Sequence, residues 1–349
     1  MKKYIYITLV VLLGGCFLPD EVLPSLPPHE VTVELNLKEN STVYLNLENS
    51  KNPDSLSNDW HLKFQNAADG WSIYLNTLES VAIYNTKETD FSKVDYSYFD
   101  LDLPWRVDVP TPSGLYPALG PWGDFQYANP KSFKNVYLVS WNDGQINYIS
   151  KLQILDASKN AYHIRFGPLG EENSQSVWIQ KDAAYTHGYF SFQTGLQLNN
   201  IEPKIANWDM CFTYLSDSLV AHAATPATTT INPYFGLYPG VVVNYQKSKI
   251  HLDTNANFDK IDYFYAKELD YTGVDQLYNV FYAQKLVYKG VDDLFNAFYS
   301  WDGPSQQLIL NERLTVVVEQ GEKYFALRPK KVETNSLQAF KLTLEVKQL

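Results

Sequence analysis

The chain of 349 residues contains little cysteine, and this limits how it can be stabilised. Cys16 lies near the N-terminus, and Cys211 is the only other cysteine. Because the residues around Cys16 are those of a lipidation site, as described below, Cys211 is left without an intramolecular partner. A disulfide framework is therefore excluded, and stability must come from hydrophobic cores. A chain of this length suits two such cores.

Positive charge is also scarce. The sequence has 28 Lys and Arg residues against 39 Asp and Glu residues, which gives a formal net charge of −11. No cluster of basic residues offsets the long-range repulsion of polyanions that this charge produces. We therefore expect neither nucleic acid nor an anionic membrane surface as the partner.

Familiar catalytic motifs are missing as well. The sequence contains no GxSxG, HExxH or GxGxxG pattern and no phosphate-binding loop. Asp100 and Asp102 are expected on one face of a strand, but paired carboxylates without a neighbouring base are weak indicators of acid–base catalysis. The segment Asp253 to Lys260 has the oxygen spacing of a calcium loop but lacks its glycine and final glutamate, which favours an Asx turn. We do not expect an enzyme.

The N-terminal residues have the pattern of an exported lipoprotein. Two lysines precede an apolar run that is too short to cross a bilayer and is typical of a signal peptide. The residues LGGC, which end at Cys16, resemble the bacterial lipobox, in which the cysteine is diacylated and becomes the new N-terminus. We predict a signal peptide over residues 1–15 and a lipidated, proline-rich tether over residues 16–29. The implied location is the outer membrane, with a lipid anchor and exposure at the cell surface.

Alternation with a period of two residues dominates the rest of the chain. Residues 31–37 and 340–346 alternate apolar and polar side chains, which is typical of half-buried strands. Turn residues at Asn142 to Gly144 follow an apolar run and indicate an antiparallel hairpin. Helical spacing is confined to Val274 to Phe298. The predicted fold class is all-β, with at most one or two short helices.

A pair of short sequence segments occurs twice in the chain. The first copy holds NDWHLKF (Asn58 to Phe64) and DFSKVDYSY (Asp90 to Tyr98). The second copy holds ANWDMCF (Ala206 to Phe212) and NFDKIDYFY (Asn257 to Tyr265). Such internal similarity indicates tandem copies of one scaffold.

A turn-rich, polar stretch from Gly167 to Gln175 separates the copies. We therefore predict a first β domain over residues 30–169 and a second over residues 173–349. Trp60 and Trp208 recur in both copies within alternating segments, so both are expected in cores rather than at ligand sites.

The second copy resembles a known family of surface lipoproteins. The segments YFSFQTG and NWDM, between Tyr189 and Met210, are followed by FYSWDGP (Phe298 to Pro304) and RLTVVVEQGEKYFALRP (Arg313 to Pro329). In this order they are similar to the HmuY-like family of Bacteroidetes, whose scaffold the first copy shares more faintly. The resemblance implies two tandem antiparallel β domains. It also implies haem capture, since the founding member takes haem from host carriers and holds the iron between two axial histidines.

The axial ligands of that family are not matched in this sequence. One position falls on Trp301, whose indole nitrogen is only a donor and cannot ligate iron. The other falls between Tyr271 and Tyr288, a segment without histidine or methionine, where tyrosinate could hold ferric haem. The aromatic residues of this region are therefore the candidate ligand-binding residues, namely Tyr278, Tyr282, Tyr288, Tyr299 and Trp301.

The six histidines form no cluster with metal-ligand spacing. His222 and His251 flank an insertion in the second copy and are the only pair that we would test as metal or haem ligands. A plain surface role is the favoured interpretation for both, because a lone surface histidine rarely binds a ligand. Haem is thus the only cofactor that we expect, and only the resemblance to the HmuY-like family suggests it.

Two functions follow from these patterns. The preferred function is an outer-membrane lipoprotein of the haemophore-like type, which captures haem or another small ligand for uptake. A TonB-dependent receptor is the partner that this function implies. The alternative is a non-haem surface module that binds a glycan, a peptide or a partner outer-membrane protein on the same scaffold.

Overall fold

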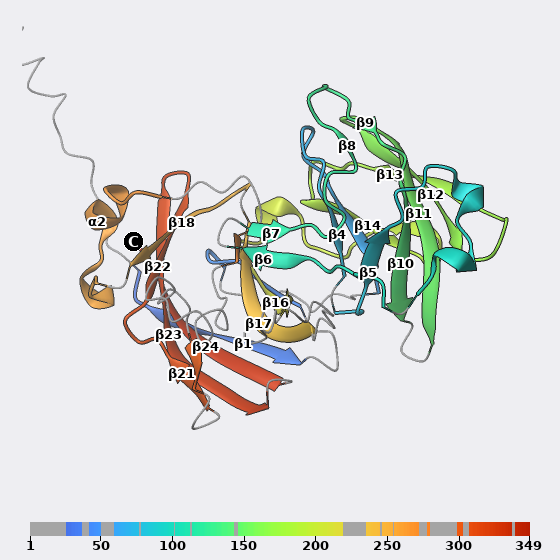
Figure 1. Ribbon diagram of the computed structural model, residues 1–349. Helices are drawn as coiled ribbons and strands as arrows, with labels where there is room; N and C mark the ends of the chain where they lie inside the picture. Colours follow the sequence, from blue (N-terminus) through green and yellow to red (C-terminus); the bar gives the residue numbers. More distant parts are fainter. Residues whose placement is uncertain are drawn as a thin grey trace, which may run out of the picture.

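The protein consists of two groups of antiparallel sheets that lie side by side (Figure 1). The computed structural model describes residues 26–36, 42–49, 59–76, 78–100, 102–111, 114–142, 146–218, 235–244, 246–253, 255–271, 278–279, 299–302, 307–336 and 339–349. These residues contain one short α-helix and four short 3-10 helices besides the strands, so the predicted all-β fold is confirmed. Over the same residues, no helix is long and apolar enough to cross a membrane.

The first unit comprises residues 59–203 and is built from two sheets. Its larger sheet has the strand order β13-β12-β11-β10-β5, and its smaller sheet has the order β15-β14-β3-β4. The strands are β3 (Leu62–Gln65), β4 (Ile73–Leu75), β5 (Ala82–Asn85), β10 (Val136–Asn142), β11 (Asn147–Ala157), β12 (Ala161–Pro168), β13 (Gln175–Gln180), β14 (His187–Ser191) and β15 (Leu196–Leu198).

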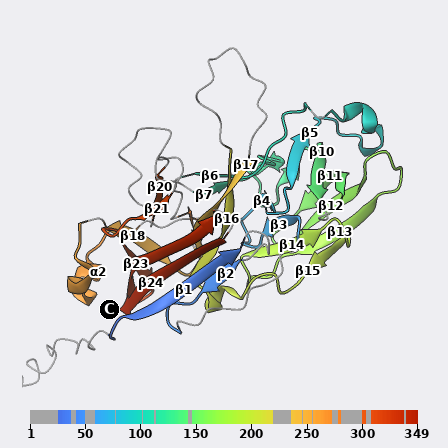
Figure 2. The ribbon, with the colours of Figure 1, turned by 90° about the horizontal axis from the view of Figure 1, so that it is seen from below.

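The second unit comprises residues 29–49 together with residues 205–349. Its larger sheet has the order β1-β24-β23-β22-β18, and its smaller sheet has the order β19-β17-β16-β2. Figure 2 shows β1 running beside β24, at the opposite end of the sequence. The strands are β1 (His29–Asn36), β2 (Val43–Leu45), β16 (Met210–Ser218), β17 (Phe235–Val243), β18 (Lys249–Asp253), β19 (Tyr278–Asn279), β22 (Thr315–Gln320), β23 (Lys323–Ser336) and β24 (Ala339–Gln348).

The larger sheets of the two units match strand by strand, but their edge strands are exchanged. β12, β11, β10 and β5 occupy the places that β24, β23, β22 and β18 occupy in the second unit. The edge beside β12 is filled by β13, whereas the edge beside β24 is filled by β1 from the N-terminus. In the smaller sheets, β14 lies beside β3 and β2 lies beside β16. Each unit is thus completed by strands that belong to the other copy in the sequence.

This pairing cuts across the predicted ranges 30–169 and 173–349. The strands within residues 29–45 bond to the second unit, and those within residues 175–198 bond to the first. The two predicted ranges describe the copies in the sequence. The sheets divide the chain differently, because each combines strands from both ranges. Sequence patterns could not show the exchange, because an edge strand offers the same unpaired main-chain groups to either copy.

Matching aromatic pairs show that β2 and β14 are counterparts. The ring centroids of Trp60 and Tyr189 lie 5.2 Å apart at an interplanar angle of 73°. Those of Trp208 and Tyr44 also lie 5.2 Å apart, at 77°. Both tryptophans are buried, as predicted. The same edge-to-face contact, which aromatic rings favour, therefore joins the exchanged strand to the scaffold in each unit.

Each unit has a core between its two sheets. In the second unit Val31, Val33 and Leu35 of β1 face the core, which confirms the alternation expected there. In the first unit Trp122 is part of the core, with 1% of its surface exposed. Its indole nitrogen donates to the carbonyl of Trp71 at 2.8 Å, so this tryptophan packs on its own domain rather than serving a ligand.

The repeated DFSK and NFDK segments fold alike. η2 (Phe91–Lys93) and η5 (Phe258–Lys260) are single 3-10 turns, capped by the side chains of Asp90 and Asn257. η3 (Tyr96–Tyr98) and α2 (Tyr263–Lys267) follow them in the chain. The α-helix thus lies before the segment 274–298, where helical spacing predicted one; apart from β19, that segment is outside the described residues.

One local prediction is wrong and one is confirmed. Asp100 lies in a turn, where its Oδ1 accepts the N–H of Asp102 at 2.9 Å, because Asx side chains compete with strand pairing. The Asx turn at Asp253 is confirmed, with Oδ1 accepting two main-chain N–H groups at 2.8 Å.

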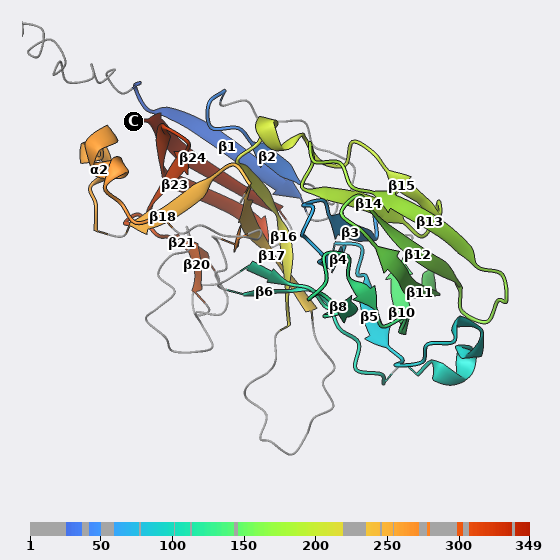
Figure 3. The same ribbon diagram turned by 90° about the horizontal axis from the view of Figure 1, so that it is seen from above.

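Smaller elements surround the sheets. The ribbon of β6 and β7 belongs to the first unit but reaches across to lie against β16 of the second (Figure 3). The other ribbons pair β8 with β9 and β20 with β21. The bounds of these elements are β6 (Val109–Thr111), β7 (Gly114–Tyr116), β8 (Gly123–Asp124), β9 (Lys131–Ser132), β20 (Tyr299–Asp302), β21 (Gln307–Leu310) and η4 (Ile205–Asn207).

Candidate functional site

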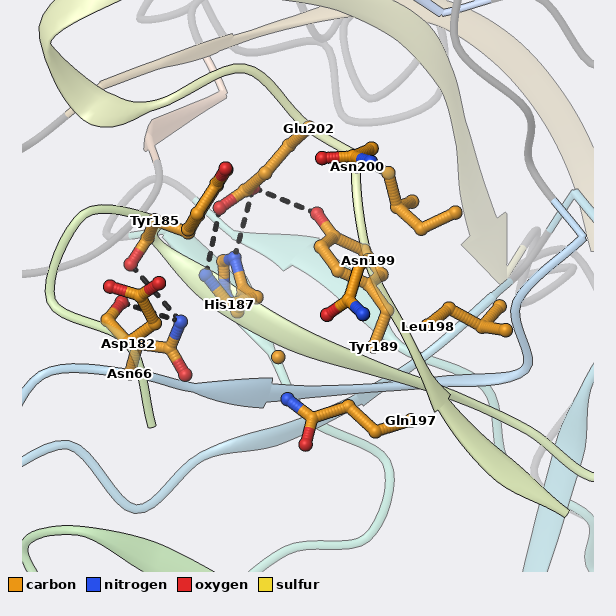
Figure 4. A pocket seen from close by; sticks show the side chains of 12 residues that line it. Asn66, Asp182, Tyr185, His187, Tyr189, Gln197, Leu198, Asn199, Asn200 and Glu202 are labelled. Atoms are coloured by element: carbon orange, nitrogen blue, oxygen red, sulfur yellow. Dashed lines mark hydrogen bonds and ion pairs between the residues drawn. The ribbon is translucent and has the colours of Figure 1, made fainter. Parts of the chain in front are cut away.

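A pocket of about 220 Å³ opens in the first unit beside β14 and β15. Its walls come from the end of β3, from residues 182–189 and from residues 197–202 (Figure 4). Strand pairing between β14 and both of its neighbours fixes the spacing of these walls. The pocket is therefore built on paired strands as well as on loops.

Glu202 is the buried anchor of the pocket wall, with 4% of its surface exposed. Its Oε2 accepts the hydroxyls of Thr186 at 2.6 Å and of Tyr189 at 2.8 Å. Its Oε1 accepts the main-chain N–H of His187 at 2.9 Å. Burial alone would raise the pKa of this carboxyl, but hydrogen bonds from His187 and Thr186 hold the pKa below its ordinary value. Glu202 thus remains a carboxylate that ties the 186–189 segment to the 199–202 loop.

His187 takes part in the same network as a neutral side chain. Burial lowers its pKa, despite the nearby carboxylate of Glu202. Its Nδ1 lies 2.8 Å from the hydroxyl oxygen of Thr186. Since the single hydroxyl hydrogen of Thr186 goes to Glu202, we assign the imidazole hydrogen to Nδ1, which donates to Thr186. His187 is therefore a structural donor here and not a free base.

Asn66 forms one end of the pocket, next to Asp182 and Tyr185 (Figure 4). Its amide nitrogen donates to the carbonyls of these two residues, at 2.9 Å and 3.2 Å. Its side chain is buried, and its Oδ1 has no hydrogen-bond partner among the described residues. The amide is thus held in place by its nitrogen, while its oxygen keeps an unused acceptor capacity.

The opposite side of the pocket is formed by β15 and the loop after it. Gln197 binds the main chain of Gln180 twice, accepting its N–H at 2.8 Å and donating to its carbonyl at 3.0 Å. A side chain at Gly188 would meet Nε2 of Gln197 at 3.3 Å, so glycine allows this close approach. Asn199 and Asn200 are exposed and form the rim.

The floor of the pocket lies at the junction of the two units. Tyr189 extends from the pocket toward Tyr44 of the exchanged strand β2, and hydrogen bonding and charge interactions couple these hydroxyls to Glu202 and Cys211. Lys63 is close to this group, 5.5 Å from the ring centroid of Trp60, and burial lowers its pKa. Burial raises the pKa of Cys211 to about 12, so its thiol is not a nucleophile.

None of the described residues that line this pocket is among those predicted from the sequence. Backbone strands β19 and β20 carry Tyr278, Tyr299 and Trp301, whose side chains lie outside the described part of the structure. His251 is on β18 of the second unit, with its Nδ1 2.8 Å from the carbonyl of Asp270. Four further predicted residues fall outside the described residues altogether, namely Cys16, His222, Tyr282 and Tyr288.

Metal binding finds no support within the described part of the chain. No group of three or more His, Cys, Asp or Glu side chains there could hold an ion. The carboxylate of Asp253, which a calcium loop would need, accepts main-chain N–H groups and the hydroxyl of Tyr265 instead.

Sequence reasoning missed the residues that form the pocket. Glu202 is the one acidic residue in the segment LQLNNIEPK. Its position close to two asparagines was the only feature of the sequence that could have indicated a binding site. Asn66 gave none, because asparagine after a strand usually marks a turn. Asn66 and Glu202 come to line one pocket because β14 pairs with β3, although the two strands lie about 125 residues apart in the sequence. No local sequence pattern reveals such a pairing.

Comparison with known proteins gives no assignment: no family model, no curated protein and no solved structure matches this chain.

Proposed function

We propose that this chain is a lipid-anchored binding protein of the outer-membrane surface, which captures a small polar ligand for uptake. The anchor rests on the LGGC segment that ends at Cys16. The supporting observation for capture is the pocket of the first unit, whose amide, hydroxyl and carboxylate groups converge on one cavity. This lining favours the glycan-like alternative among the functions that the sequence suggests.

The pocket has the rigidity that a preformed binding site needs. Glu202 bonds three groups of the facing segment, and Gln197 bonds the main chain of the neighbouring strand. Side chains and main chain on both sides of the cavity are thereby fixed before a ligand arrives, which reduces the entropic cost of binding. No residue of the pocket carries a reactive nucleophile, so binding without chemistry is the function that we propose.

Haem capture is the second candidate, and the resemblance to the HmuY-like family carries it. The candidate tyrosines and Trp301 fall within residues 205–349 of the sequence, whereas the described pocket is lined by residues of the first unit. The two candidates therefore predict binding in different halves of the chain. A TonB-dependent receptor would be the partner in either case.

Titration with haemin and with a panel of saccharides separates the two candidates. Capture of a polar ligand predicts a calorimetric or ligand-observed NMR signal with saccharides and no intense, shifted Soret band with haemin. A Soret band that saturates at one haem per chain would favour haem instead, and Tyr278→Phe, Tyr282→Phe and Tyr288→Phe would then be compared with His222→Ala and His251→Ala. Folded protein that binds neither class, nor peptides, would refute ligand capture.

The anchor is tested separately. Cys16→Ser should release soluble protein or leave unprocessed precursor, and an unchanged membrane fraction would contradict lipidation. Co-purification of a TonB-dependent receptor with the wild-type chain would support the proposed partner.

A further inference from the structure

The larger sheet of the first unit carries an aromatic pair on its outer face. Trp178 of β13 pairs with His163 of β12, and their ring centroids lie 4.3 Å apart at an interplanar angle of 7°. The residues beside them, such as Tyr162, Ile164 and Ile179, are buried in the core, so alternation directs the pair outward. His163 stacks on one face of the indole, yet Trp178 is 48% exposed. The solvent-accessible surface of Trp178 therefore belongs to the opposite face and the edges of its ring.

The corresponding edge of the second unit lacks such a pair. There β24 pairs with β1, and the outward-facing matches are Glu30 with Glu345, Thr32 with Thr343 and Glu34 with Lys341. None of these side chains is aromatic, and an ion pair joins Lys341 to Glu34 at 2.6 Å. The shared scaffold can thus close this edge without stacked rings. The aromatic pair needs an explanation other than the fold.

The side chains around the open face of Trp178 can bind hydroxyl groups. Ser176 and Gln180 lie two residues before and after Trp178 on β13, so they share its face of the sheet, and both are exposed. Asp156 of β11 pairs with His163 and is exposed as well. A flat apolar ring with accessible donors and acceptors beside it matches a ligand that has both an apolar face and hydroxyls at its edge.

The charges near the pair disfavour an anionic ligand. Arg165 is the next outward-facing residue of β12, and its Nε donates to Oγ of Ser174 at 2.9 Å. Its guanidinium also covers the ring of Phe91, at 4.3 Å from the ring centroid. This cation is thus already engaged, and the net charge of −11 repels phosphates and carboxylates over a longer range. The ligand class that fits is neutral.

We propose that the open face of Trp178 stacks on a pyranose ring of a neutral glycan. The ring C–H bonds of a sugar are slightly positive and pack against the negative face of the indole. The stack with His163 already holds the indole in place, so little side-chain entropy is lost on binding. The inference rests on the proposed function for its class of ligand. It adds a site outside the described pocket, since Trp178 does not line that cavity.

The sheet that carries the pair is well placed for a long ligand. In Figures 1 and 3, β11, β12 and β13 lie on the side of the first unit that faces away from the second unit. An open sheet face of this kind accepts an inner unit of a chain as readily as a terminal one. A free monosaccharide and a unit within a polysaccharide share the stacking chemistry, and the experiment below separates them.

The experiment titrates the full chain with methyl β-glucoside and with oligosaccharides of glucose, galactose, mannose and N-acetylglucosamine. Calorimetry gives the affinity, and NMR follows the indole N–H signals. The signal of Trp178 is the one that is missing from Trp178→Phe, and it should shift as saccharide is added. Trp178→Ala should bind the best saccharide roughly tenfold more weakly, with an unchanged melting temperature because the ring is at the surface. Equal affinity for the glycoside and the oligosaccharides identifies one ring as the ligand, while binding of oligosaccharides alone identifies a polysaccharide.

His163 is a positioning residue in this proposal. His163→Ala should weaken saccharide binding several-fold, because the indole loses the ring that holds it in place. His163→Phe restores a flat ring beside the indole and should recover the affinity. Recovery by phenylalanine separates stacking from any other role of the imidazole.

Phe133 provides a matched control in the same unit, since it is 49% exposed. Phe133→Ala should leave saccharide affinity unchanged, and an equal loss in Phe133→Ala and Trp178→Ala would overturn a specific site. Saccharide binding that is as tight in Trp178→Ala as in the wild type would overturn this site while glycan capture stands. Binding of haemin or peptides with no saccharide binding would overturn the sugar class. No binding of any ligand would refute the proposed function itself.

Discussion

The two units share one scaffold, and the pocket described here lies in the first. By the offset that aligns Trp60 with Trp208, Asn66 corresponds to Tyr214. Gly188, which pairs with Phe64, corresponds to Val43, which pairs with Phe212, so the second unit has the larger residue at both positions. The recurring tryptophans, the capped 3-10 turns and the strand order of the larger sheet are the same in both. In the first unit, smaller residues on or next to the inner strands β14 and β3 thus accompany the cavity.

A second difference concerns how each unit binds its exchanged strand. His61 and Asp209 occupy equivalent positions, one residue after the recurring tryptophans. Nδ1 of His61 accepts the N–H of Phe192 at 3.1 Å, and Oδ2 of Asp209 accepts the N–H of Leu47 at 2.7 Å. The first unit uses a neutral ring for this bond, whereas the second uses a carboxylate paired with Lys247 at 2.6 Å.

Removing the exchanged strands gives the largest expected effect. A chain that begins after residue 49 lacks β1 and β2, so both sheets of the second unit lose a strand. The first unit keeps all of its strands, because they all lie within residues 59–203. We expect the second unit to lose its whole free energy of unfolding, about 5 kcal/mol or more, while the first stays folded. Peptide-resolved hydrogen exchange measures the two units separately.

The complementary fragments sharpen this test. A fragment of residues 59–203 should fold alone, and a fragment of residues 205–349 should fold only when a peptide of residues 26–49 is added. Protected amides in the second unit without that peptide would show that the exchanged strands are dispensable there.

Truncating the recurring tryptophans should produce the next largest effect. Trp60→Ala and Trp208→Ala each remove a buried ring that contacts the exchanged strand, at a cost of about 3–5 kcal/mol. Trp208 is 1% exposed and Trp60 is 8% exposed, so the loss should be larger in the second unit. Urea denaturation of the two variants compares them, with the Phe substitutions as milder controls. A loss below about 1 kcal/mol in either variant would contradict a core role.

Acid should affect the first unit through His61. Burial lowers the pKa of His61 from 6.5 to about 4. Between pH 6.5 and pH 4 the unfolded chain therefore binds a proton that the folded unit excludes. The stabilisation is complete above pH 6.5, is lost as the pH falls to 4, and amounts to about 3 kcal/mol.

Hydrogen exchange of the first unit at several pH values checks this prediction. In His61→Asn, the amide oxygen takes the place of Nδ1 as the acceptor, and this variant should show a flatter pH dependence over the same window. An equal slope in wild type and His61→Asn would mean that other groups cause the acid sensitivity.

The sequence predicted the scaffold well and the pocket poorly, for a physical reason. Alternation along β1 and recurrence of Trp60 and Trp208 report burial, which depends on local pattern and on residue type. The strand exchange and the pocket depend on contacts between residues far apart in the chain, such as Asn66 with Tyr185. Local patterns carry no information about which edge a strand joins, so neither feature could be predicted.

The smallest expected effect concerns the cations that cover the recurring phenylalanines. Phe91 lies between Lys151 of β11 and Arg165 of β12, with the guanidinium carbon 4.3 Å from the ring centroid. Phe258 lies between Arg328 of β23 and Lys347 of β24, at 4.4 Å and 4.9 Å. Lysine lies on the first strand and arginine on the second in the first unit, and this order is reversed in the second unit. Each phenylalanine ring nevertheless contacts one lysine and one arginine. A positive charge over the ring is thus what the two units have in common.

Replacing one cation by an apolar side chain of similar length measures this interaction. Arg165→Met should cost about 0.5–1 kcal/mol, the usual value for a partly exposed cation–π contact. Arg328→Met should cost more, because Arg328 also donates to the carboxylate of Glu345 at 2.6 Å. Arg165→Lys and Arg328→Lys keep the charge and should recover most of the first loss but only part of the second, since lysine cannot reproduce the planar contact of a guanidinium with Glu345. Equal losses for both Met variants in urea denaturation would mean that the ion pair adds nothing, and the two rings would then be held by the same forces in both units.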